Sequence, residues 1–374
     1  MFLPLLSSVL AFGGLVGNTV IIAQFVVMQE NKLNFHRIMI LLSLYDNVLI
    51  VMCLILFVAP AFSETYKFGV FNDIAPVALP VGEIAITGSI YSTIAITLER
   101  FLAVCHPFYA ISHRWRANRY IIPIVMFSLL YNIPIFFEIK STTINCAHIY
   151  NNSSQSTLTI QGGIEPMYEN VTISMCIKEF TKRRIFKPDC GLVEDCVFQK
   201  LTPTTIRQNY NYFTIYHIVF DLLFKCIIPF VILVVLNTLM IKRFIHRKDT
   251  KDKNLGNNIV MNNKVKMSLI SRNSEDKHSF VYKTDQVTSY GEIFLAKVNL
   301  IIVFFCILCH SIRWIPQFYE IFYGLEDWPQ WITTVKHINH IAILLTSSIN
   351  CCVYYNFPFR LVSQTRQCHA NNII

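Results

Sequence analysis

The stretch from Ile74 to Val104 reads IAPVALPVGEIAITGSIYSTIAITLERFLAV, and its charged residues are Glu83, Glu99 and Arg100. It is longer than the roughly 20 apolar residues that carry an α-helix across a bilayer. A charge well inside hydrocarbon costs roughly 2.5 to 3.5 kcal/mol on insertion scales, so all three groups are candidates for a functional site. Taken alone, Glu99 and Arg100 favour an anchor at the membrane edge, because basic side chains commonly reach the headgroups from the end of a span.

The whole chain has the composition of a membrane protein. Of its 374 residues, 53% are hydrophobic and 15% are charged, which excludes an ordinary soluble domain. The apolar stretches lack alternating polarity, and lipid tolerates no unpaired backbone, so they predict helices and not the strands of a barrel. We expect an all-α membrane protein, one seven-transmembrane helix bundle over residues 1–374. The seven stretches are Phe2–Met28, Arg37–Ala61, Ile74–Val104, Tyr120–Phe137, Phe213–Ile241, Phe294–Phe318 and Trp331–Tyr355.

Glycosylation sequons indicate which side of the membrane is outside. Asn151, Asn152 and Asn170 each begin an Asn-x-Ser/Thr sequon, and all three lie in the loop 139–211 between the fourth and fifth stretches. This loop is far longer than an ordinary connection, so it is either structured for function or disordered. Cysteines in an oxidising compartment favour structure through internal disulfides, with three connectivities open. These cysteines are Cys146, Cys176, Cys190 and Cys196.

Basic residues indicate the cytosolic side. The segment after the third stretch carries Arg114, Arg116 and Arg119 and no acid, as the positive-inside rule expects. We therefore expect the amino terminus outside, and a flexible loop 242–292 and a short tail 356–374 in the cytosol. The net charge of +9 then belongs mostly to cytosolic segments and implies no nucleic-acid partner. Cys368 in the tail is a weak palmitoylation candidate.

The first apolar stretch begins at residue 2. The outer amino-terminal segment is therefore expected to be either negligible or truncated in this sequence.

Several polar residues lie well inside the apolar stretches. Each is costly if it has no partner. Ser and Asn can bond locally to the backbone, but the carboxylate of Asp46 cannot be neutralised in that way. We expect a shared polar centre, with a sodium ion as a possible occupant and no other cofactor. Its members would be Asn18, Asp46, Ser89, Ser347 and Asn350.

Five short motifs occur in order on five of these stretches. They are Gly17-Asn18, Leu42-Ser43-Leu44-Tyr45-Asp46, Glu99-Arg100-Phe101, Trp314-Ile315-Pro316 and Asn350-Cys351-Cys352-Val353-Tyr354. Together with Pro229, they resemble the signatures of rhodopsin-like G-protein-coupled receptors. The segments Leu98–Pro107, Leu129–Glu138 and Cys309–Arg313 are similar to invertebrate, in particular nematode, FMRFamide-type neuropeptide receptors, and nematode chemosensory receptors are the alternative within the family.

The sequence departs from the family pattern at three positions. Ala75 stands near the usual helix-three cysteine, which leaves the common disulfide to the outer loop in doubt. Cys351 replaces the helix-seven proline, so a bend there needs another cause. Ala296 stands where many relatives have the acid that pairs with the helix-three arginine, so Arg100 is expected to be held mainly by Glu99.

The resemblance implies a plasma-membrane receptor that binds an extracellular peptide and activates a heterotrimeric G protein. A basic, amidated peptide needs an acid for its guanidinium, and Glu83 and Asp221 are the candidates. An equally weighted alternative is that Glu83 pairs with Arg313 as a structural contact. The implied ligand pocket comprises Glu83, Asp221, Arg313, Gln317, Glu320 and His340.

The resemblance also implies the residues of the conformational switch. These are Glu99, Arg100, Phe101, Trp314, Pro316 and Tyr354. A transporter or channel is the alternative from another class, but the sequence shows neither an internal repeat nor a chain of ionisable groups crossing the bundle. An enzyme is not indicated, because no nucleophile with a base and no metal-ligand set stands out in the sequence.

Overall fold

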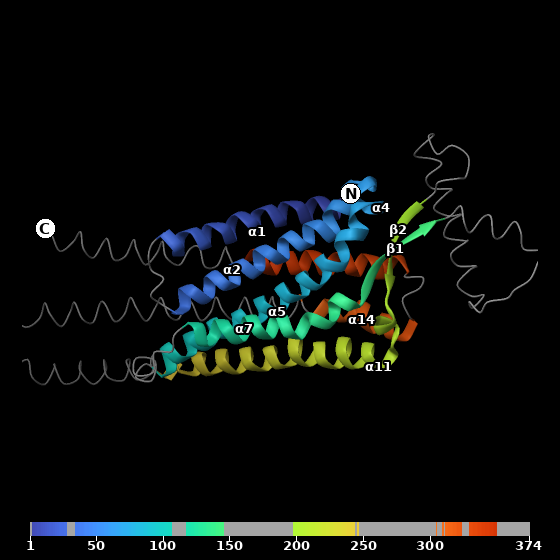
Figure 1. Ribbon diagram of the computed structural model, residues 1–374. Helices are drawn as coiled ribbons and strands as arrows, with labels where there is room; N and C mark the ends of the chain where they lie inside the picture. Colours follow the sequence, from blue (N-terminus) through green and yellow to red (C-terminus); the bar gives the residue numbers. More distant parts are fainter. Residues whose placement is uncertain are drawn as a thin grey trace, which may run out of the picture.

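The chain forms a bundle of long helices with a small β-hairpin at one end (Figure 1). The computed structural model describes residues 2–27, 34–106, 117–145, 197–243, 245–246, 304, 309, 311–323 and 329–349. Within these ranges, five helices are long and apolar enough to cross a membrane, and they overlap the first five apolar stretches of the sequence. Their spans are Leu3–Val26, Asn34–Phe62, Val70–Cys105, Asn118–Phe137 and Tyr210–Arg243.

Two of the first four spans, the second and the fourth, contain a segment that is not regular α-helix. The first is α1 (Phe2–Val27). The second runs from α2 (Asn34–Cys53) through the π-helical η1 (Leu54–Val58) into α3 (Ala59–Phe62), and the short α4 (Glu64–Phe68) follows. The third is α5 (Val70–Cys105), which contains Pro76 and Pro80. The fourth is α7 (Asn118–Asn132), which tightens into the 3₁₀ turn η2 (Ile133–Phe137) around Pro134.

The remaining helices follow the hairpin. The fifth span joins the short α11 (Tyr210–Tyr212) to the π-helical η3 (Phe213–Phe220) and η4 (Leu222–Ile227) and continues as a regular helix over 228–243. The sixth stretch overlaps α14 (Trp314–Tyr323). The seventh stretch overlaps a helix over residues 330–349. The expected end of the sixth helix at Phe318 is wrong, because the apolar face continues to Tyr323, whose ring stacks on Tyr319.

The β-hairpin was not predicted in any detail from the sequence. β1 (Ile139–Asn145) pairs antiparallel with β2 (Val197–Pro203), in the register Ile139 to Pro203 and Asn145 to Val197. The backbone N–H of Thr204 donates to the Glu138 carbonyl at 2.8 Å and closes the ladder beside the bundle. α10 (Thr205–Gln208) then leads into the fifth span. The two ends of the long loop are therefore fixed side by side over the helices.

Apolar side chains fill the bundle and also cover its outside. One buried cluster joins α1, α2, α5 and α7 around Ile38, Leu42 and Ile96. A second joins α1, α2, α5 and the helix 330–349 around Ile50 and Leu344. Large apolar side chains are exposed on the outside of the same helices, for example Phe12 and Ile122. Such a surface suits a lipid environment and not water.

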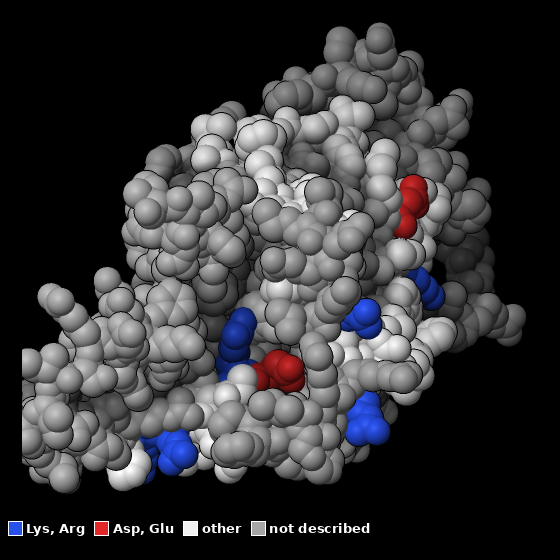
Figure 2. Space-filling model, turned by 90° about the vertical axis from the view of Figure 1, so that its left-hand side faces the viewer, with Lys and Arg blue, Asp and Glu red and all other residues white. Residues whose placement is uncertain are grey.

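Charged residues gather at the end of the bundle opposite the hairpin. Figure 2 views the molecule from that end, and Lys and Arg side chains lie around it. Exposed basic residues mark the helix ends there, at Arg37 on α2, Arg119 on α7, and Lys242 and Arg243 at the end of the fifth span.

Tyr45 connects three of the helices. Its ring, on α2, lies directly against the backbone of α5 at Gly88, where any Cβ atom would collide with it. The Tyr45 hydroxyl shares a hydrogen bond of 2.9 Å with Ser128 on α7. Close to it, the Asn132 amide donates to Thr87 on α5 at 3.0 Å. The missing side chain at Gly88 therefore allows α2, α5 and α7 to pack closely.

We expect Gly88→Ala to destabilise the bundle by about 1–3 kcal/mol, because the new methyl group forces Tyr45 out of its site. Gly13→Ala on α1 is the matched control, because a Cβ there meets nothing within 4 Å. Thermal unfolding of the two purified variants measures the difference. Equal unfolding midpoints would show that Tyr45 moves without cost.

Candidate functional site

Four charged side chains meet inside the hairpin half of the bundle. Glu83 comes from α5, Asp221 and Lys225 from the fifth span, and Arg313 from the residue before α14. Asp221 and Lys225 are four residues apart, so they lie on the same face of their helix. Their side chains are 2% and 5% exposed. We call these four residues the inner ionic cluster.

The distances show that every charge in the inner ionic cluster has a partner. Arg313 Nη2 donates to both carboxylate oxygens of Glu83 at 2.7 Å. Lys225 Nζ donates to Glu83 Oε2 at 2.8 Å and lies 2.9 Å from Asp221 Oδ1. Arg313 is also 3.6 Å from Asp221, and the Tyr131 hydroxyl donates to Asp221 at 2.8 Å. Two acids and two bases give the cluster no net charge.

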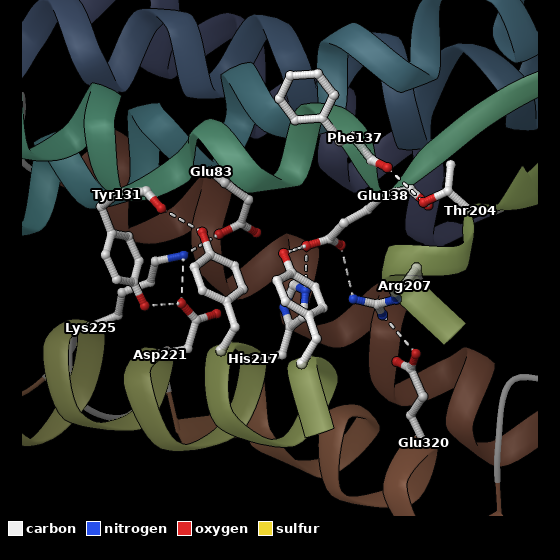
Figure 3. A network of polar contacts seen from close by, with 12 residues as sticks. Glu83, Tyr131, Phe137, Glu138, Thr204, Arg207, His217, Asp221, Lys225 and Glu320 are labelled. Atoms are coloured by element: carbon white, nitrogen blue, oxygen red, sulfur yellow. Dashed lines mark hydrogen bonds and ion pairs between the residues drawn. The ribbon is translucent and has the colours of Figure 1, made fainter. Parts of the chain in front are cut away.

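A second network lies between the inner ionic cluster and the hairpin (Figure 3). Its centre is Glu138, which follows the fourth span and is 2% exposed. Glu138 accepts hydrogen bonds from Tyr212 and Arg207 at 2.7 and 3.1 Å, and it lies 2.7 Å from His217 Nε2. Arg207 also donates to Glu320 on α14 at 2.6 Å. We call Glu138, Arg207, Tyr212, His217 and Glu320 the outer network.

The outer network connects the base of the hairpin to three helices. Thr204 follows β2 and donates to the Phe137 carbonyl at 2.6 Å, which sets Arg207 beside Glu138. Burial raises the pKa of the Glu138 carboxyl, but the contacts of His217, Tyr212 and Arg207 outweigh it and hold this pKa below its usual range. Glu138 is therefore an anion that fixes the positions of its neighbours.

A tyrosine ladder joins the two networks. The ring of Tyr216 stacks between those of Tyr131 and Tyr212. Its hydroxyl donates to the Tyr131 carbonyl at 2.5 Å. Tyr131 bonds Asp221 of the inner ionic cluster, and Tyr212 bonds Glu138 of the outer network. A movement of the hairpin base can therefore reach the inner ionic cluster through packed, hydrogen-bonded groups.

The structure distributes the expected ligand-pocket residues over several places. Glu83, Asp221 and Arg313 lie in the inner ionic cluster, where the acids are already paired with bases. Glu320 lies in the outer network. The ring of His340 stacks on that of Phe57. Gln317 lies on α14 and takes no described part in either network.

Sequence reasoning missed five members of these networks, which are Lys225, Glu138, Arg207, Tyr212 and His217. Lys225 is an ionisable residue inside an apolar stretch, and the rule that singled out Glu83 applies to it equally. Glu138 directly follows an apolar stretch and precedes the long loop. The same rule applies to His217, which lies in the same apolar stretch as Lys225. Arg207 carries no comparable signal, because it becomes a neighbour of Glu138 only when the hairpin closes.

A pocket opens beside the inner ionic cluster. Apolar residues of α2, η1 and α5 form most of its wall, and Glu83 and Arg313 border it. The helix 330–349 contributes Asn339, His340 and Ile343. Its volume is about 80 Å³.

The expected polar centre is partly described. The Ser89 hydroxyl donates to Asp46 at 2.7 Å, and the Asn18 amide donates to the Ser347 carbonyl at 3.3 Å. Asp46 and Asn18 are fully buried, and Asn18 Oδ1 accepts no hydrogen bond from any described residue. Carboxylate, amide and hydroxyl oxygens suit a hard cation. These residues therefore fit sodium, whose binding stays a prediction.

The switch residues lie in the other half of the bundle or on α14. The Arg100 guanidinium lies 3.6 Å from the centre of the Phe35 ring, a cation–π contact between α5 and α2. Phe101 packs against Val104, which is also on α5, and against Met240 of the fifth span. Trp314 begins α14 and is 9% exposed. Retention of Arg100 by Glu99 stays a prediction.

Several expected residues lie outside the described part of the chain. They are the four loop cysteines Cys146, Cys176, Cys190 and Cys196, the sequons at Asn151, Asn152 and Asn170, and Asn350, Tyr354 and Cys368.

Comparison with known proteins shows a family similarity over part of the chain. Residues 17–165 match the family model described as "7 transmembrane receptor (rhodopsin family)". Over this part of its length the chain is similar to rhodopsin-family seven-transmembrane receptors.

One curated relative matches almost the whole chain. Over 353 residues the chain is 26% identical to the FMRFamide receptor of Drosophila melanogaster, and the match covers 92% of this chain and 49% of the relative. The chain thus spans about half the length of this relative.

We expect Lys225→Met to destabilise the receptor by about 3–5 kcal/mol, because it leaves the buried carboxylate of Asp221 and the partly buried one of Glu83 with one base. The double variant Asp221→Asn/Lys225→Met removes one charge of each sign and should recover most of the loss. Thermal unfolding and surface expression measure both variants. A double variant as unstable as Lys225→Met would contradict the pairing of these two residues.

Proposed function

We propose that the chain is a receptor for a short extracellular peptide, with an amidated FMRFamide-like peptide as its ligand, and that it signals through a heterotrimeric G protein. The family supports a receptor, and the printed name of the relative supports this ligand class. The hairpin half of the bundle holds the pocket and the inner ionic cluster, which together offer polar and apolar contacts.

The proposal includes an orientation in the membrane. The hairpin end faces outside, and the amino terminus lies on that side. The sequons lie between β1 and β2 in the sequence, which supports this orientation. Exposed Arg and Lys residues at the opposite helix ends support it too, since basic residues favour the cytosolic side.

The observation that carries the mechanism is the position of Arg313. It is bound to Glu83 and directly precedes Trp314, the first residue of α14. A ligand that binds better when these contacts are rearranged shifts the equilibrium between the two arrangements by that difference in affinity. Helix six would then move about Trp314 and Pro316, and sodium at Asp46 would favour the resting form. The outer network would transmit contacts made at the hairpin.

The proposed ligand class is tested by a cell-based screen of short amidated peptides for G-protein activation. We expect at least one of them to activate the receptor. Activation by small environmental compounds and by no peptide would favour a chemosensory receptor instead, and ion or substrate flux without G-protein activation would favour a transporter or channel.

Arg100→Ala should abolish G-protein activation in a receptor that still reaches the cell surface, because the proposed output group is lost. Arg37→Ala is the control, since it removes another basic residue from the same end of the bundle. Surface labelling and nucleotide exchange measured on the same cells separate folding from signalling. Full signalling by Arg100→Ala would refute the role given to this residue.

A further inference from the structure

The pocket beside the inner ionic cluster has a nearly continuous apolar wall. Leu49, Met52 and Leu56 of the second span face Leu79 and Ile86 of α5 across it. Ile343 closes the side formed by the helix 330–349. A polar or charged ligand group would lose its hydration here without replacement along most of the surface.

The volume of the pocket limits the size of its occupant. An engineered cavity of ~150 Å³ accommodates benzene, and a water needs only ~10–15 Å³. The pocket, at about 80 Å³, lies between these values. It therefore suits a branched aliphatic group better than an aromatic ring.

Gly82 contributes to this space. A Cβ atom at Gly82 would lie 3.6 Å from Met52 Cβ, which is an ordinary contact, so alanine fits there without strain. A larger side chain at the same position would extend into the pocket that Gly82 lines. A substitution at Gly82 can therefore be used to fill the pocket.

The charged border of the pocket is already neutralised. Glu83 binds Arg313 and Lys225, and Asp221 balances the remaining charge. A cationic group on the ligand would have to displace one of these bases from a buried acid. A carboxylate would meet Glu83 at close range, and Arg313, the base at this border, is already bonded to both Glu83 oxygens. The border therefore favours an uncharged group.

Asn339 is a polar residue in the pocket wall, next to His340. It lines the pocket and is 7% exposed, and its side-chain oxygen accepts no hydrogen bond from the residues that the structure describes. A buried acceptor without a donor is unfavourable, so a group that brings an N–H or O–H donor gains by binding there.

We infer that this pocket binds a branched aliphatic group carrying an uncharged hydrogen-bond donor, such as a carboxamide, with the donor bonded to the Asn339 side-chain oxygen. The inference rests on the proposed function, in which this group is part of the extracellular ligand. It assigns a leucine-sized side chain next to an amide to this site, and it places any aromatic ring of the ligand elsewhere.

The test uses 4-methylpentanamide as the probe, with the purified full chain in detergent and the shift of its thermal unfolding midpoint as the readout. Methyl 4-methylpentanoate has nearly the same shape without a donor, and 4-methylpentanoate carries a charge. 3-Phenylpropanamide tests the size limit. We expect the amide to bind at millimolar concentration and the ester to bind about tenfold more weakly, as expected for one lost hydrogen bond. The acid and the aromatic amide should bind more weakly than the aliphatic amide.

Variants of the pocket complete the test. Gly82→Leu should remove binding of the amide, and Gly82→Ala should fold normally and weaken it less. Asn339→Leu should bind the amide and the ester equally. If Gly82→Leu does not fold, the comparison of Asn339→Leu with the unmodified chain still tests the inference. Gly13→Ala, which is remote from the pocket, should behave as the unmodified chain.

Three results would overturn the inference: no binding of the amide to the unmodified chain, equal binding by Gly82→Leu, or equal affinity for amide and ester in the unmodified chain. A failure of this inference can be told apart from a failure of the proposed function. Amide binding without activation by any peptide would leave the pocket assigned and remove the peptide-receptor proposal. Peptide activation without amide selectivity would leave the peptide-receptor proposal standing and remove the assignment of the pocket.

Discussion

Burying charged groups away from water is costly, so the charged side chains in the hairpin half of the bundle must pair with one another. Glu83, Asp221, Lys225 and Arg313 lie in apolar helices, and each would be strongly unfavourable alone. Their mutual contacts hold α5, the fifth span and the start of α14 in one arrangement. Such a cluster adds little net stability compared with apolar packing, but the loss of one member is expensive. It therefore selects one arrangement among several that apolar packing alone would permit.

The same constraint explains why the outer network extends to the hairpin. Glu138 is buried at the end of the fourth span, and its partners come from α10, α11 and η3. Arg207 shares its guanidinium between Glu138 and Glu320 on α14. The base of the long loop and α14 are thus held by one side chain. The tyrosine ladder carries the connection inward to Asp221.

Most of the fold follows from apolar length and composition. The seven stretches predict the bundle, and the described helices begin and end within a few residues of the first five stretches. The hairpin was harder to predict from the sequence, because its strands are short and polar and are separated by the residues between Asn145 and Val197. The continuation of α14 to Tyr323 was also missed, because its contacts with neighbouring rings and Arg207 come from distant segments.

The sequence by itself predicted a seven-helix receptor from seven apolar stretches and five short motifs, and it revealed ionisable groups where lipid makes them costly. It singled out Glu83, Asp221 and Arg313, and it left open whether Glu83 binds a ligand or pairs with Arg313. The tertiary structure shows the Glu83–Arg313 pair, adds Lys225 to it, and places Glu320 in another network. The physical reason is that a single charged residue reveals its cost in the sequence, whereas its partner is set by the packing of helices that are remote along the chain.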